Sequence, residues 1–158
     1  MTTDQTPYAG LTPDVLLDAV ESVGYRVDGR MLALNSYENR VYQIGIEDSL
    51  PVIAKFYRPG RWSDAQILEE HHFTQELASR EIPVVPPLLV GDQSLHSFAG
   101  YRFSLTPRRG GRAPELDNPE VLEWLGRFLA RIHAVGAIVP FRQRPALTVA
   151  TFGEQPRD

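Results

Sequence analysis

One lysine stands out among the residues of this sequence that could do chemistry. The chain has 16 basic residues, and all of them are arginine except Lys55. Lys55 lies in the stretch 51–57, whose side chains alternate between two faces as in a β-strand, with Ile53, Lys55 and Tyr57 on one face. Lysine is a compact charge on a flexible stem, so a narrow cleft that binds phosphate oxygens can require lysine where arginine would not fit. Composition alone supports this interpretation and a chance survival of one exposed lysine equally.

A carboxylate on the next predicted helix is a candidate partner for Lys55. Residues 63–66 have the spacing of a capping box, which predicts that a helix begins there and continues to about residue 79. Glu70 is in line with the apolar residues of the inward face, which are Ile67, Phe73 and Leu77. We expect Glu70 to pair with Lys55, and Glu69, one step round the helix, is the alternative. Both glutamates could instead belong to the solvated rim of the helix.

The histidines and the other acidic residues predict no metal site. His71 and His72 are adjacent on the predicted helix, so their side chains point in different directions and would not share an ion. We expect all four histidines to lie at the surface or on helix rims; they are His71, His72, His96 and His133. The sequence has no cysteine, which excludes disulfides and thiolate ligands. We therefore predict no metal ligand in this chain.

The composition restricts the class of protein. With 158 residues, 42% of them hydrophobic and 23% charged, the chain can bury a core as a folded domain. A net charge of −4 gives no electrostatic footprint for nucleic acid or an anionic membrane. No apolar run approaches the roughly 20 residues of a membrane span, and acidic Asp4 stands where a signal peptide would be basic. We expect a cytoplasmic protein that binds neither nucleic acid nor membranes.

Apolar patterns predict an α+β fold built on a five-stranded antiparallel sheet. The stretches expected to form strands are 25–34, 41–46, 51–57, 88–90 and 101–105. Short turns join the first three of these strands, as in an antiparallel meander. Helices are expected at 13–23, 63–79 and 119–135. A proline and paired glycines within 106–112 indicate a hinge, and 137–158 shows no sustained period.

This order of elements resembles the small nucleotide-binding lobe of a protein-kinase-like fold. Three stretches resemble more closely the stress response kinase A family, bacterial Ser/Thr protein kinases of the aminoglycoside-phosphotransferase-like superfamily. They are residues 34–43 around the first turn, 54–59 around Lys55, and 66–71 on the helix. The resemblance runs from about residue 11 to at least residue 132.

The resemblance implies that this part of the chain binds ATP. Lys55 would contact the phosphates and pair with the helix carboxylate, for which we expect Glu70. The turn between the first two strands would replace a glycine-rich loop, with backbone N–H groups and the Ser36 hydroxyl over the phosphates. The residues of this turn are Ser36, Tyr37, Glu38 and Asn39.

The resemblance also implies an adenine site and a division into lobes. Val41 and Ile53 would form the apolar ceiling over adenine, and the backbone from Thr106 to Arg108 its hydrogen-bonding edge. Residues 1–107 would be the nucleotide-binding lobe, 108–117 the hinge, and 118–158 the start of a truncated C-terminal lobe. The His-Gly-Asp catalytic segment of the family is absent from the chain. We expect the Mg²⁺ ligands, like that segment, to belong to the missing lobe.

The expected parent protein transfers the γ-phosphate of ATP to Ser or Thr of a protein substrate. The 158-residue chain alone is predicted to be inactive and to self-associate through the apolar stripe of 119–135. Two alternatives stay open. One is the lobe of a small-molecule phosphotransferase that acts on an aminoglycoside or a choline-like alcohol, and the other is a non-catalytic nucleotide-binding regulatory module.

Overall fold

The structure, a computed structural model, describes residues 7–154 and is organised around one antiparallel sheet. Its strand order is β1-β2-β3-β5-β4. The strands are β1 Val27–Leu34, β2 Arg40–Ile46, β3 Val52–Phe56, β4 His96–Phe98 and β5 Tyr101–Pro107. The helices are α1 Pro13–Ser22, α2 Asp64–Ser79, α3 Pro119–Gly136 and a short π-helix, Ala150–Glu154. The α+β fold with a five-stranded antiparallel sheet, predicted from the sequence, is thus confirmed.

Helix α1 covers one face of the sheet. Thr12 caps the helix by accepting a hydrogen bond from the Val15 N–H, and proline occupies the first turn, where its missing N–H costs nothing. The inward side chains of α1 share a buried cluster with alternate residues of β3; they are Leu16, Ala19 and Val20 from α1, and Val52, Ala54 and Phe56 from β3. Because residues 52, 54 and 56 face this core, residues 53 and 55 face the opposite side of the sheet.

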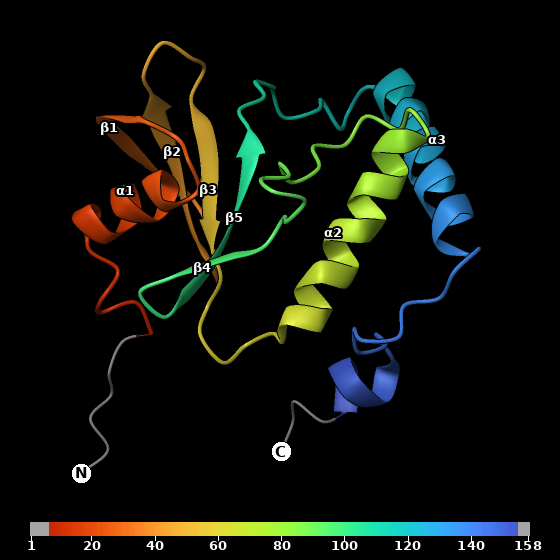
Figure 1. Ribbon diagram of the computed structural model, residues 1–158. Helices are drawn as coiled ribbons and strands as arrows, with labels where there is room; N and C mark the ends of the chain where they lie inside the picture. The colour runs from red at the N-terminus through yellow and green to blue at the C-terminus, as the bar shows by residue number, and fades with distance from the viewer. Residues whose placement is uncertain (1–6, 155–158) are drawn as a thin grey trace.

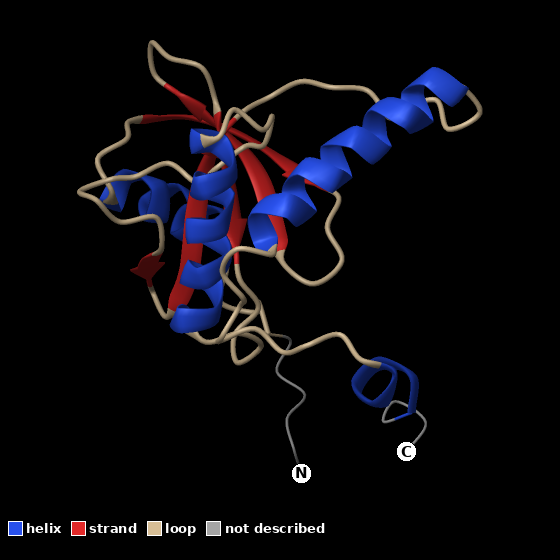
Figure 2. Cartoon of the chain, turned by 90° about the vertical axis from the view of Figure 1, so that its right-hand side faces the viewer, coloured by secondary structure: helices blue, strands red, loops and turns tan. Residues whose placement is uncertain are grey.

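Helix α2 stands on the other side of the sheet from α1 (Figure 1), and α3 meets α2 near the C-terminal end of each helix. The predicted capping box is present, since Ser63 accepts from the Gln66 N–H and the Gln66 side chain accepts from the Ser63 N–H. Ile67 and Leu77 are buried on α2, and Leu77 packs in a small cluster with Val135 of α3. The π-helix lies apart from the sheet (Figure 2).

The apolar stripe of α3 is only partly covered. Leu122, Trp124 and Leu129 are each about half exposed, while Val135, near the end of the helix, is buried. None of the helices between residues 7 and 154 carries an apolar stretch long enough to cross a bilayer.

The prediction of the fourth strand was wrong. Residues 88–90 form no strand; Leu88 donates one backbone hydrogen bond to Leu105, and Val90 pairs only with Gln93. The prolines at positions 83, 86 and 87 remove backbone donors, so the preceding segment stays extended without a ladder. The fourth strand is His96–Phe98, which is too short for an alternation signal.

The first strand is irregular near its start. Its register against β2 shifts between Val27 and Met31, and Gly29 within this interval has a φ of +81°. Glycine accepts this conformation because it has no Cβ. Gly29 therefore lies where the strand departs from regular pairing.

Candidate active site

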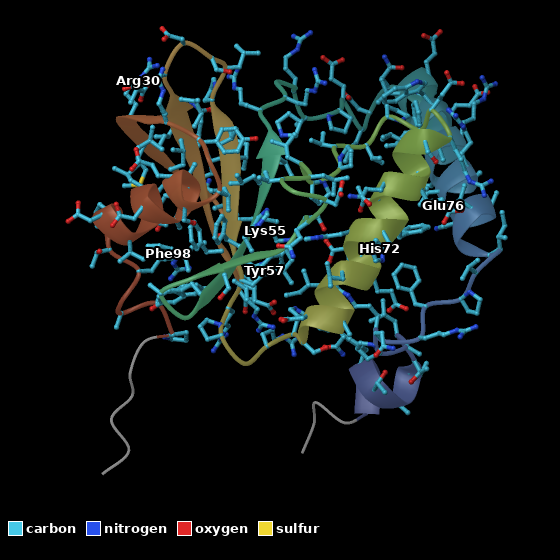
Figure 3. The ribbon with its side chains drawn as sticks, in the orientation of Figure 1. Arg30, Lys55, Tyr57, His72, Glu76 and Phe98 are labelled. Carbon is cyan, nitrogen blue, oxygen red and sulfur yellow. The ribbon has the colours of Figure 1, made fainter. Side chains whose placement is uncertain are left out.

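Lys55 lies at the centre of the sheet and faces α2. It pairs with Val41 of β2 on one side and with Ser104 of β5 on the other, so its backbone is fixed by both neighbours. Its Nζ atom is 3.7 Å from Oε1 of Glu70 on α2, and the two side chains are 32% and 40% exposed. Figure 3 labels Lys55 and Tyr57 on the side of the sheet toward α2. The structure thus brings together the two residues that the sequence suggested as a pair.

Glu69 has a different set of contacts. Its carboxylate accepts hydrogen bonds from three successive backbone N–H groups, those of Arg142 at 2.6 Å and of Gln143 and Arg144 at 2.9 Å. These contacts tie α2 to the segment that follows α3. Of the two glutamates, Glu70 is therefore the one directed at Lys55.

The surroundings of Lys55 disfavour its charge. Burial lowers the pKa of the Lys55 ammonium, the positive charge of Arg144 lowers it further, and Glu38 opposes both effects. The Tyr57 ring centroid lies 4.8 Å from Nζ, a cation–π distance. A partly desolvated ammonium of this kind gains more from an anionic ligand than a fully hydrated one does.

A buried hydrogen-bond network lies behind Lys55, which the sequence did not reveal. The Tyr57 hydroxyl is 2.7 Å from His71 Nε2 and 3.1 Å from Ser104 Oγ, and His71 Nδ1 is 2.9 Å from Ser94 Oγ. His71 is 2% exposed, so the expectation of a surface or rim position for it was wrong. Burial, followed by the nearby charge of Lys55, lowers the pKa of His71 to about 4.

His96 also departs from that expectation. It is 9% exposed, lies at the start of β4 and has its ring centroid 5.4 Å from that of Phe103. His71 follows the inward residue Ile67 by four positions on α2, a spacing that could have indicated an interior position. His96 lies in a strand of three residues, which is too short to show a pattern. By contrast, His72 and His133 are exposed, as expected.

The turn predicted to cover phosphates is closed by its own side chains. The Ser36 hydroxyl donates to the Asn39 carbonyl, and Asn39 Oδ1 accepts from the Arg58 N–H at 3.2 Å. Tyr37 is fully exposed at the tip. Ser36 and Asn39 therefore hold the shape of the turn.

Glu38 connects this turn to the segment that leads into α2. Its carboxylate accepts from Arg61 Nε and from Trp62 Nε1, each at 2.8 Å. The hydrogen bond from Arg61 is the main cause of the lowered pKa of Glu38. Sequence reasoning missed Arg61 and Trp62, because a contact between residues more than 20 positions apart leaves no local pattern.

An apolar surface extends from Lys55 across the sheet. Val41 lies directly beside Lys55, and Ile53 lies beside Thr106, so these residues share one face. Leu32 and Leu34 of β1 continue it, and both are exposed. Thr106 is partly buried at the end of β5, and the following Arg108 is exposed. The predicted adenine residues thus form part of a partly exposed, largely apolar face next to a cation.

Among residues 7–154, no three His, Cys, Asp or Glu side chains converge as they would around a metal ion.

Known proteins with similar sequences point to one family. Residues 31–157 match the sequence profile of the phosphotransferase enzyme family. Over 147 residues, or 93% of this chain, the sequence is 45% identical to stress response kinase A of Salmonella choleraesuis. The corresponding identity is 44% for serine/threonine protein kinase RdoA of Salmonella typhimurium and 43% for stress response kinase A of Escherichia coli K12. In each case the match spans 45% of the relative, so the chain covers about half the length of these relatives.

A solved structure has the same fold. It is an amicoumacin kinase, hAmiN, in complex with AMP-PNP, Ca²⁺ and Ami, and it superposes with a TM-score of 0.73. The two sequences are 20% identical, and the match covers 96% of this chain and 48% of the other.

Proposed function

Because this chain belongs to the phosphotransferase enzyme family, we propose that it supplies the ATP-binding lobe of a kinase that phosphorylates Ser or Thr of a protein. The position of Lys55 carries the proposal. The single lysine of the chain stands beside a partly exposed, largely apolar sheet face, with its ammonium toward a glutamate on the helix that follows. ATP has the matching arrangement, because its flat base could lie on the apolar face while its charged phosphates reach the lysine.

Each part of the nucleotide would contact one group of residues. Adenine would rest on Val41 and Ile53, with Leu32 and Leu34 extending the apolar contact. The backbone from 106 to 108 would meet the edge of the base. The phosphates would lie between Lys55 and the N–H groups of the turn 36–39, where oriented backbone dipoles favour an anion.

We propose that residues 1–107 form this lobe, that 108–117 form a hinge, and that 118–158 begin a second lobe. The Mg²⁺ ligands and the catalytic base would belong to the part of the relatives outside the 147 matched residues. Bound Mg²⁺ would offset the charge of the phosphates. On this proposal the 158-residue chain binds ATP weakly and does not turn it over.

The acceptor is proposed from the relatives. One of them is named a serine/threonine protein kinase, which supports a protein hydroxyl as the acceptor. The structural match to an amicoumacin kinase concerns the fold alone, since its sequence is 20% identical. A small-molecule acceptor is the second candidate.

Nucleotide binding is the direct test. The chain has two tryptophans, so Trp124→Phe leaves Trp62 beside the turn as the single indole reporter of AMP-PNP binding in the presence of Mg²⁺. Lys55→Ala in this background should raise the Kd about 10- to 100-fold, the range expected for losing charge-assisted hydrogen bonds. Arg127→Ala, which removes one exposed charge on α3, is the control and should leave the Kd unchanged. Equal binding by the Lys55→Ala chain would overturn the proposal.

A chimera tests the acceptor. This chain would replace the 147 matching residues of the Escherichia coli relative, and transfer from ATP would be measured to a Ser/Thr-rich protein and to an aminoglycoside. We expect transfer to the protein, and loss of that transfer with Lys55→Ala. Transfer to the aminoglycoside alone would favour the small-molecule candidate.

A further inference from the structure

The segment that follows α3 is fastened along the exposed side of α2. Glu69 accepts the three backbone N–H groups of residues 142–144, and the Gln66 side chain donates to the Gln143 carbonyl at 2.9 Å. Phe141 meets Phe73 of α2 edge to face, with ring centroids 5.1 Å apart. These contacts place Arg144 in a fixed position over the middle of the helix.

The Arg144 guanidinium is constrained on three sides. Its Nε donates to the Gln66 carbonyl at 3.1 Å, its Cζ lies 4.4 Å from the centroid of the Trp62 ring, and its Nη2 forms an ion pair with Glu70 Oε2. The side chain is 23% exposed, so the flexible stem of the arginine has little freedom left. A planar fork held in this way can fix the orientation of a carboxylate.

The Glu70 carboxylate uses a different oxygen for each cation. Oε2 contacts Arg144, while Oε1 lies 3.7 Å from Lys55, beyond ordinary hydrogen-bond length. A half-exposed glutamate held only by so long a contact would gain little from it and would turn toward water. Arg144 does not occupy Oε1, so it can orient the carboxylate without taking the place of Lys55.

We propose that Arg144 is a positioning residue that holds Glu70 toward Lys55, so that the segment after α3 controls the ion pair in the nucleotide site. The inference rests on the proposed function for the role of Lys55 and adds a control element to that site. The same guanidinium stacks on Trp62, whose indole N–H holds Glu38 of the turn 36–39. The contact between Arg144 and Trp62 therefore connects the ion pair to the turn.

Arg144 could also have the opposite effect on the ion pair between Lys55 and Glu70. Arg144 carries the same charge as Lys55, so it could instead draw Glu70 away from the lysine. Besides burial, Arg144 and Glu38 shift the pKa of Lys55. The other charged or titratable groups that face it are Glu70, at 3.7 Å, the Tyr57 ring, at 4.8 Å, and His71 behind it. His71 is neutral near pH 7, because its pKa is about 4. Positioning and competition predict opposite changes in the coupling between Lys55 and Glu70.

A double-mutant cycle on the single lysine separates the two effects. Lysine labelled with ¹³C at Cε gives one side-chain signal in this chain, and its shift against pH reports the pKa of Lys55. Glu70→Gln should lower this pKa in the native background, because an anion is lost. In an Arg144→Gln background, Glu70→Gln should lower the pKa of Lys55 by at most about half of its effect in the native background. The reason is that Glu70 is no longer held toward Lys55. Equal lowering in both backgrounds, or a larger lowering without Arg144, would overturn the inference.

Arg142→Gln is the matched control for charge. It makes the same substitution two residues away, at an exposed side chain. The backbone N–H of residue 142 still donates to Glu69 in this variant. It should leave the coupling unchanged. Amide spectra check the fold of each variant. If Arg144→Gln does not fold, Arg144→Lys, which keeps the charge without the fork, should give an intermediate coupling. This variant adds a second lysine signal, and the signal that disappears with Lys55→Arg in the same background is assigned to Lys55. Equal coupling in the native and Arg144→Lys chains would also contradict the inference.

The cycle is independent of the nucleotide. If AMP-PNP binds equally to native and Lys55→Ala chains, the proposed function fails whatever the cycle shows. If Lys55→Ala abolishes binding while the cycle shows no role for Arg144, the inference alone fails.

Discussion

The Trp62 indole N–H donates a 2.8 Å hydrogen bond to Glu38 Oε1 and thereby joins the turn between β1 and β2 to the segment that leads into α2. Arg61 and Arg144 lie over the same ring at 4.7 Å and 4.4 Å. The turn proposed to bind phosphates is thus supported from outside by an aromatic residue that contacts two guanidinium groups.

Trp62→Phe should weaken nucleotide binding while keeping most of the ring contacts. The variant loses the hydrogen bond to a carboxylate, which is partly exposed, so we expect the Kd for AMP-PNP to rise about 3- to 10-fold. Calorimetry measures this without a fluorescent reporter. Trp124→Phe on α3 is the control and should bind as the native chain does. Identical affinities in the two variants would show that the Glu38 contact does not shape the turn.

Buried His71 should make the chain less stable in acid. Its pKa is about 4 in the folded state and about 6.5 in the unfolded chain, so between these values the unfolded state binds more protons. The contribution of His71 is therefore constant above about pH 7 and falls as the pH drops toward 4, by about 2 kcal/mol at pH 5. Urea unfolding at pH 7 and pH 5 measures the loss.

His71→Gln isolates this effect, because an amide can donate and accept but does not titrate in this range. The pH dependence of the free energy of unfolding should be smaller in the variant, whereas His133→Gln at an exposed position should leave it as in the native chain. A dependence unchanged by His71→Gln would mean that the fold leaves the pKa of His71 near its ordinary value.

The apolar side of α3 should drive self-association. Leu122 and Leu129 are about half exposed, and burying such a side chain is worth about 1.5–3 kcal/mol in full. Sedimentation velocity should show concentration-dependent association of the native chain and a monomer for the Leu122→Glu/Leu129→Glu variant. The charge swap Glu123→Arg/Arg127→Glu preserves an ion pair four residues apart and should still associate. A monomeric native chain would contradict the prediction.

Local sequence patterns were sufficient to predict most of the fold. The alternation around Lys55, the capping box at Ser63 and the prolines and asparagine at helix starts identified β3, α1, α2 and α3 within a few residues. The same periodicity placed Glu70 on the face of α2 toward Lys55. These features depend on neighbours close in sequence, where patterns carry the information.

The remaining parts of the site depend on distant contacts. The hydrogen bonds of His71 reach Tyr57 and Ser94, which are 14 and 23 positions away, and Arg144 reaches Glu70 across 74 positions. A polar residue on a helix gives no sign of such partners. β4 escaped prediction for a similar reason, since three residues held by β5 are too few to show a period.

The edges of the sheet restrict how the chain can assemble. β4 offers only three residues as an edge, and β1 has a shifted register between Val27 and Met31, with Arg30 exposed in that interval. Short, bent or charged edges are poor templates for strand addition. Copies of the chain should therefore meet through side chains of α3, in assemblies that disperse on dilution, and should resist the growth of cross-β fibrils.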